Sequence, residues 1–116
     1  MKKINILGST GIIGKKSLRI ITNDFSQYKI NYLLANNNYK LLAKQANLYN
    51  PNYIGLINEN NYFKLKKLVK NKKIKIFSGS ECKDVLKKNV NLSIMAISGI
   101  SALKYIKETI IHSEQI

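Results

Sequence analysis

The sequence predicts an α/β domain in which a mostly parallel sheet carries helices on both faces. Short apolar runs rich in β-branched residues alternate with longer stretches whose apolar residues recur at helical spacing. With 116 residues and a hydrophobic fraction of 45%, the chain has the size of one domain and can bury a core. No long linker or internal repeat interrupts the alternation, as expected for consecutive βαβ units.

The expected strands are short runs dominated by Ile, Leu, Val and Tyr. They cover residues 4–7, 29–35, 53–57, 74–77 and 92–97. The last run is almost wholly apolar, which is typical of a strand that is buried on both faces of a parallel sheet.

The expected helices have apolar residues three and four apart, with lysines between them. They cover residues 13–21, 41–49, 62–69, 82–86 and 100–111, and Pro51 follows the second of them as a stop signal. The residues expected to face inward are Ile13, Leu18 and Ile21, then Phe63, Leu65, Leu68 and Val69, and finally Ala102, Leu103, Ile106 and Ile110.

The net charge of +14 comes from 20 basic and six acidic residues, yet Arg19 is the only arginine. Recognition of bases and phosphates relies on the fork of arginine, whereas lysine acts as a point charge. Because Asn and Ile are also abundant, we interpret the charge as a bias of overall composition and expect no nucleic-acid partner. The lysine-rich residues 64–76 are interpreted as the solvated face of a helix and a turn.

Residue counts also exclude disulfide-linked, membrane-spanning and secreted proteins. The single cysteine, Cys82, cannot form an internal disulfide. No apolar run approaches the ~20 residues that span a bilayer, and the N-terminus lacks the long apolar segment of a secretory signal. We therefore expect a cytoplasmic protein without a membrane partner.

The stretch GSTGIIG, from Gly8 to Gly14, follows the first expected strand and contains three of the six glycines. In a doubly wound, Rossmann-like fold, glycines at this place make a tight turn, admit a pyrophosphate and let the helix pack closely. The spacing is a variant of G-x-G-x-x-G, and its position after a buried N-terminal strand favours a dinucleotide site over a merely tight turn. The fold is therefore expected to be Rossmann-like and doubly wound.

The end of the second expected strand indicates which dinucleotide binds. NAD-binding domains usually place a carboxylate there to hold the ribose 2′-hydroxyl. This chain has Ala35, three asparagines, Tyr39 and Lys40, with no carboxylate before Glu59. Amide N–H groups can donate hydrogen bonds to a 2′-phosphate, and a nearby lysine balances its charge. The sequence therefore favours NADP over NAD.

Four segments, INILGSTGIIG, LLANNN, LLAKQANLYNPNY and IMAISGISAL, have the order and spacing of the 1-deoxy-D-xylulose 5-phosphate reductoisomerase family, which the chain resembles along nearly its whole length. The segment AKQANLYNPNY is the strongest evidence for the resemblance, because nucleotide-binding domains in general do not require these residues. The resemblance implies NADPH and a divalent metal, Mg²⁺ or Mn²⁺, as cofactors. It implies rearrangement and reduction of a phosphorylated sugar to 2-C-methyl-D-erythritol 4-phosphate, in non-mevalonate isoprenoid synthesis, by a homodimer.

The resemblance assigns cofactor contacts to two short segments. Thr10, Gly11 and Ile13 match positions whose backbone N–H groups meet the cofactor phosphates. Ile12 stands where the family usually has Ser, so only its backbone contact is implied.

The second segment matches the loop that holds the adenosine ribose and its phosphate. Asn36 and Asn38 match this loop, and Asn37 stands where the family usually has Lys or Arg. Ser98 and Gly99 match the far side of the cofactor, and Ala102 replaces a usual Gly.

The resemblance covers only the N-terminal NADPH-binding domain, so residues 1–116 are expected to form part of it. The family's catalytic and metal-binding groups match positions beyond residue 116, and the next strand is expected to start at Gln115–Ile116. No catalytic or metal-binding residue is assigned within the chain, which is expected to be a truncated product that is inactive alone. His112 is expected to be a solvated residue at a helix end.

Two alternatives remain open at this point. A non-catalytic NADP-binding module or a decayed gene product is favoured by the departures at Ile12, Asn37 and Ala102. A basic nucleic-acid-binding domain has only the charge in its favour, because no zinc spacing, recognition-helix signature or aromatic stripe accompanies it.

Overall fold

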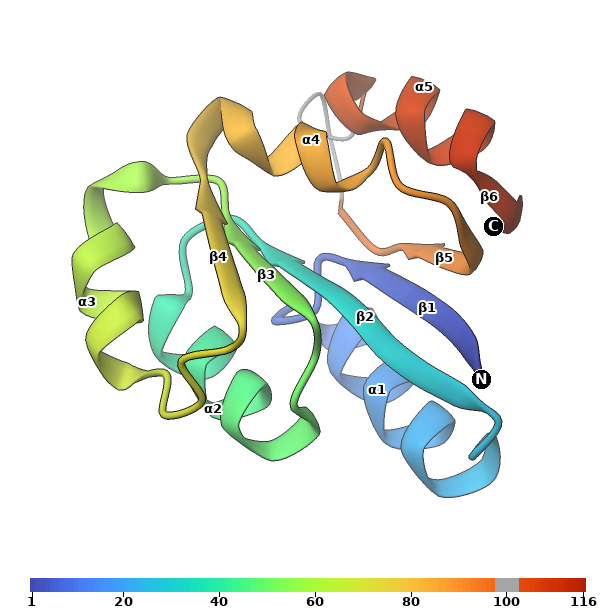
Figure 1. The fold of residues 1–116 in the computed structure, drawn as a ribbon, viewed down its shortest axis with the longest axis horizontal. Helices are drawn as coiled ribbons and strands as arrows, with labels where there is room; N and C mark the ends of the chain where they lie inside the picture. Colours follow the sequence, from blue (N-terminus) through green and yellow to red (C-terminus); the bar gives the residue numbers. More distant parts are fainter. Residues whose placement is uncertain (98–102) are drawn as a thin grey trace.

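The computed structural model describes residues 1–97 and 103–116 (Figure 1). The strands are β1 (Lys2–Leu7), β2 (Tyr28–Ala35), β3 (Tyr53–Leu56), β4 (Lys75–Ser78), β5 (Val90–Met95) and β6 (Ser113–Gln115). The helices are α1 (Ile12–Asp24), α2 (Tyr39–Tyr49), α3 (Tyr62–Leu68), α4 (Cys82–Val85) and α5 (Leu103–His112), with 3₁₀ turns η1 (Glu59–Asn61) and η2 (Gly79–Glu81).

All six described strands form one sheet in the order β4-β3-β2-β1-β5-β6, and every neighbouring pair is parallel. The chain adds β2, β3 and β4 on one side of β1, then returns to add β5 and β6 on the other side. The predicted doubly wound α/β fold is confirmed. The direction of winding reverses between β1 and β5, and ligands of such sheets bind beyond the carboxyl ends of the strands at this place.

Each face of the sheet has its own core, and Figure 1 shows α1, α2 and α3 on one side and α4 and α5 on the other. The first core joins α1, α2 and α3 to the sheet, with Leu18, Leu42 and Leu65 almost fully buried. The second core joins α4 and α5 to β1 and β2, around Tyr32 and Cys82. Because β1 supplies side chains to both cores, the strand that ends in the glycine loop is fixed from two sides.

Several residues predicted to face inward are exposed instead. Phe63 is 73% exposed, because α3 buries Leu65 and the following Val69, and Phe63 packs its ring edgewise on Tyr62 outside the core. Leu68 is exposed for the same reason. Ile13 is 65% exposed, because it lies in the first turn of α1, ahead of the turns that cover the sheet.

The last part of the chain also differs from the prediction. The strand expected at 92–97 is found at Val90–Met95, two residues earlier, and Ile110 is exposed because α5 buries Tyr105 and Thr109. The next strand, expected at Gln115–Ile116, is already present as β6, where Ser113 pairs with Val90. Ala102 and the side chains of Leu103 and Ile106 lie outside the described residues.

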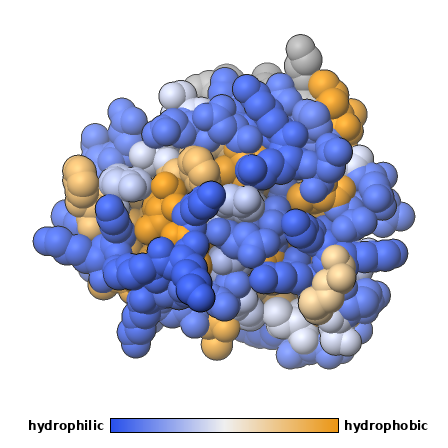
Figure 2. Space-filling model, viewed as in Figure 1, coloured by the Kyte–Doolittle hydropathy of each residue, from blue (hydrophilic) through white to orange (hydrophobic). Residues whose placement is uncertain are grey.

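Hydrophilic residues cover most of the face in Figure 2, and the apolar residues visible there gather in small patches among them. Within residues 1–97 and 103–116, no helix is long and apolar enough to cross a bilayer.

Candidate nucleotide-binding site

The glycine stretch forms the loop between β1 and α1 at the carboxyl edge of the sheet. Gly8 N–H and Ser9 N–H both donate to the carbonyl of Leu34 in β2, at 2.7 and 3.0 Å. On the other side, Ala96 N–H donates to Leu7 at 2.7 Å. The loop therefore lies at the reversal of winding between β1 and β5.

The three glycines have different surroundings. Gly8 has φ +91°, and a Cβ there would lie 2.6 Å from the carbonyl oxygen of Ala96. A Cβ on Gly14 would collide with the carbonyl oxygen of Gly8, which is how closely α1 packs against the loop. Gly11 has an ordinary φ of −76°, and the nearest described atom to its Cβ position is 3.5 Å away. The fold requires glycine at residues 8 and 14, whereas nothing in the described chain requires it at 11.

The start of α1 presents unpaired backbone donors. The first turn of a helix has N–H groups without intrahelical partners, and they attract anions. Gly11 N–H is used, because it donates to Gly8 at 3.2 Å. The N–H groups of Thr10, Ile12 and Ile13 form no hydrogen bond with any described residue. No side chain caps this helix and its first turn contains no acidic residue, so an anion meets no competing carboxylate there.

The asparagines after β2 differ in how their side chains are used. The Oδ1 of Asn38 accepts from Leu41 N–H at 3.2 Å and caps α2. The Oδ1 of Asn37 accepts from Asn58 at 2.8 Å, which ties the loop after β2 to the loop after β3. The exposed side chain of Asn36 forms no hydrogen bond within the part of the chain that the structure describes. Asn58 is thus a supporting residue that no local sequence pattern indicates, because its role depends on the pairing of β2 with β3.

Of the remaining predicted contacts, the structure places Lys40 but not the pair on the far side of the cofactor. Ser98 and Gly99 lie outside the described residues. Lys40, in the first turn of α2, is exposed two residues after Asn38. It supplies positive charge on the α2 side of this edge.

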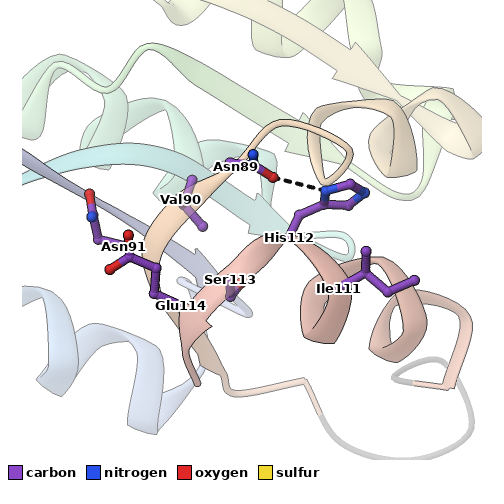
Figure 3. Close-up of a pocket in the computed structure, with 7 residues that line it drawn as sticks. All are labelled: Asn89, Val90, Asn91, Ile111, His112, Ser113 and Glu114. Carbon is purple, nitrogen blue, oxygen red and sulfur yellow. Dashed lines mark hydrogen bonds between the residues drawn. The ribbon is translucent and has the colours of Figure 1, made fainter.

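A cavity of about 360 Å³ lies at the opposite edge, where β5 and β6 begin (Figure 3). Its lining includes His112, whose Nδ1 lies 2.9 Å from Asn89 Oδ1 and whose Nε2 lies 3.4 Å from Glu108. His112 is the last residue of α5, as predicted, but it is half-buried rather than fully solvated. In the described ranges, no three His, Cys, Asp or Glu side chains gather into a group that could hold a metal ion.

The family model of 1-deoxy-D-xylulose 5-phosphate reductoisomerase matches residues 4–116. The chain belongs to this family. A reductoisomerase of Pelagibacter ubique is 39% identical over 107 residues, which are 90% of this chain and 28% of that protein. A reductoisomerase of Wigglesworthia glossinidia brevipalpis is 40% identical over 111 residues, again 28% of its length.

Solved reductoisomerase structures have the same fold. The Zymomonas mobilis reductoisomerase in complex with NADPH superposes with a TM-score of 0.87 at 25% identity, covering 94% of this chain and 29% of that one. A reductoisomerase in complex with NADPH, fosmidomycin and magnesium gives 0.84 at 26% identity, covering 94% and 28%. The chain therefore spans somewhat more than a quarter of the reductoisomerases that it matches.

Proposed function

We propose that residues 1–116 form the NADPH-binding part of a 1-deoxy-D-xylulose 5-phosphate reductoisomerase. Gly11 carries the proposal, because it is the glycine of GSTGIIG that the described fold does not need: a Cβ there would make only an ordinary contact, 3.5 Å from the carbonyl oxygen of Gly8. A glycine whose missing Cβ leaves room beside three unpaired N–H groups fits a pyrophosphate. Two matched reductoisomerase structures contain NADPH, which agrees with this fit.

The pyrophosphate is held, in this proposal, by the backbone N–H groups of Thr10, Ile12 and Ile13, with Gly11 giving the close approach. The isoleucine side chains add no polar contact. The exposed side chains of Ile12 and Ile13 instead offer apolar cover beside the cofactor.

The adenosine ribose and its 2′-phosphate lie, in this proposal, at Asn36, Asn37 and Asn38. Asn36 donates through its amide, because its side chain is not engaged within the described chain. The Oδ1 atoms of Asn37 and Asn38 each accept a hydrogen bond from the protein, which orients both side chains and fixes the shape of the loop, while their Nδ2 groups are left to donate.

When bound, NADPH supplies the hydride that reduces the rearranged sugar phosphate to 2-C-methyl-D-erythritol 4-phosphate. The described residues offer no metal-binding group, so none of them is assigned to Mg²⁺ or Mn²⁺. The proposal further includes 1-deoxy-D-xylulose 5-phosphate as the substrate and a metal that is held by other parts of the enzyme. It also includes a homodimer and a cytoplasmic location.

Titration with NADPH, followed by fluorescence, tests the proposal. Gly11→Val should weaken NADPH binding at least a hundredfold, because the new side chain occupies the space of the phosphates and blocks the helix N-terminus. Lys66→Ala and Lys67→Ala, on the exposed face of α3, should leave the affinity unchanged. Equal affinity in the Gly11 variant and the parent would contradict the phosphate site.

A further inference from the structure

Gln45 of α2 reaches across to the glycine loop. Its Nε2 donates to the carbonyl oxygen of Ser9 at 2.8 Å, and this hydrogen bond joins residues 36 apart in the chain. Both residues are buried, Gln45 with 5% of its surface exposed and Ser9 with none. Gln45 belongs to AKQANLYNPNY, the stretch that nucleotide binding in general does not explain.

With this hydrogen bond, both backbone polar groups of Ser9 are held in place. Its N–H already donates to Leu34 in β2, and its carbonyl is now held by α2. The orientation of the Gln45 amide follows from chemistry, since a backbone carbonyl can only accept and therefore faces Nε2. Thr10 and Gly11 follow Ser9 directly in the chain. The backbone N–H groups of the loop therefore come after a residue whose N–H and carbonyl are both held by hydrogen bonds.

This hydrogen bond is the main polar interaction that a glutamine supplies here. Gln45 Oε1 and Ser9 Oγ are buried without a partner among the described residues. Burying an unpaired polar atom costs stability, and an apolar side chain of similar length, such as Met, would fill the space without leaving an amide oxygen unpaired. A role in packing alone would thus be served better by another residue.

We propose that Gln45 is a positioning residue for the cofactor, which holds the Ser9 carbonyl so that the next N–H groups point at the pyrophosphate. This inference rests on the proposed function. Gln45 itself touches no part of the cofactor and acts through the loop. Replacing Gln45 should weaken the binding of ligands that contain a pyrophosphate. The binding of ligands that reach only the asparagine loop should stay unchanged.

The experiment uses the full chain with Gln45→Met and two ligands. NADPH contains the pyrophosphate, whereas 2′-AMP contains adenosine and the 2′-phosphate without it. We expect Gln45→Met to raise the Kd of NADPH about tenfold or more and to change the Kd of 2′-AMP less than about threefold. If Gln45→Met does not fold, Gln45→Asn, whose amide is one methylene too short to reach Ser9, is measured in the same way.

Asn47→Ala is the matched control. Asn47 also joins α2 to a neighbouring segment, through Leu68 at 3.1 Å and Lys70 at 2.9 Å, and it is remote from the glycine loop in these contacts. The control should lower the melting temperature and keep the parental Kd of both ligands below that temperature.

The outcomes separate the two proposals. A parent chain that does not bind NADPH contradicts the proposed function itself. A parent that binds NADPH, with a Gln45→Met variant that binds it equally well, overturns only the positioning role. Equal weakening of NADPH and 2′-AMP in that variant also overturns it, because a general structural defect then accounts for the loss.

Discussion

The carbonyl oxygen of Gly8 occupies the place where a Cβ on Gly14 would lie, so no side chain fits at residue 14. This contact brings the first turn of α1 onto the loop that leaves β1. The fold therefore requires glycine at residue 14, whereas a Cβ on Gly11, three residues earlier, would make only an ordinary contact of 3.5 Å.

Gly14→Ala should therefore destabilise the chain whether or not a nucleotide is present. The new Cβ meets backbone, which cannot move aside as a side chain can, and we expect a loss of about 2–4 kcal/mol in the free energy of unfolding. Gly11→Ala is the control and should cost less than about 1 kcal/mol, because its φ suits alanine although glycine is the better N-cap residue. Urea unfolding without ligand measures both, and equal stabilities would contradict the contact.

The order and type of the elements could be predicted because they depend on local pattern. The run Ile4–Leu7 and the helical spacing of Leu18 and Ile21 indicate buried faces without any knowledge of neighbours. The face of a short helix depends on where it meets the sheet, so Phe63 was placed wrongly although it is apolar. The start of strand β6 was placed two residues too late, because only pairing with β5 makes the polar residues Ser113 and Glu114 part of a strand.

The candidate site was predictable where backbone geometry matters and not where side chains pair. GSTGIIG marks the loop by its glycines alone. The partners of that loop come from distant segments: Gln45 from α2 and Asn58 from the loop after β3, which holds Asn37. No local pattern indicates such pairs, so three asparagines that look equivalent in the sequence have different roles in the structure.

Stability should fall in alkali because of the buried pair Tyr32 and Cys82. The Tyr32 hydroxyl donates to the Cys82 carbonyl at 2.9 Å, and burial raises the pKa of the Cys82 thiol from 9.0 to about 11. Well below pH 9 the Cys82 thiol is protonated in both the folded and the unfolded chain, so its contribution to the stability of the fold is fully present. As the pH rises through 9 to about 11, the unfolded chain loses this proton before the folded chain does, and the contribution is lost. The loss is roughly 2–3 kcal/mol. Burial also raises the pKa of Tyr32 and of Tyr105 above the ordinary value of 10.0, which adds to the same trend from about pH 9 upward.

Urea unfolding between pH 8 and 10 measures this dependence, and Cys82→Ala is the control. The variant should lose most of the slope between pH 8 and 9, where the tyrosines, with an ordinary pKa of 10.0, are still almost fully protonated in the folded and the unfolded state. A parental slope in the variant would assign the effect to other groups.

Binding to duplex DNA should be weak and should vanish with salt, despite the net charge of +14. The charge comes from lysines dispersed over a hydrophilic surface, and such contacts are lost by counterion competition. Fluorescence anisotropy with a random duplex should show measurable binding at 20 mM salt and none at about 300 mM. Tight binding that persists at the higher salt would revive the interpretation as a nucleic-acid-binding domain.

Asn36→Asp should change the preference between NADPH and NADH. Asn36 is the asparagine of its loop whose side chain makes no hydrogen bond within the described residues, so a carboxylate there is free to face the ribose. It would repel the 2′-phosphate of NADPH and accept a hydrogen bond from the 2′-hydroxyl of NADH. We expect the ratio of the two Kd values to shift toward NADH by about a hundredfold or less, with at least a tenfold loss for NADPH. Asn23→Asp, an equal change of charge in the last turn of α1, should leave the ratio as it is. If both variants shift the ratio alike, overall charge governs the preference and Asn36 does not lie at the ribose.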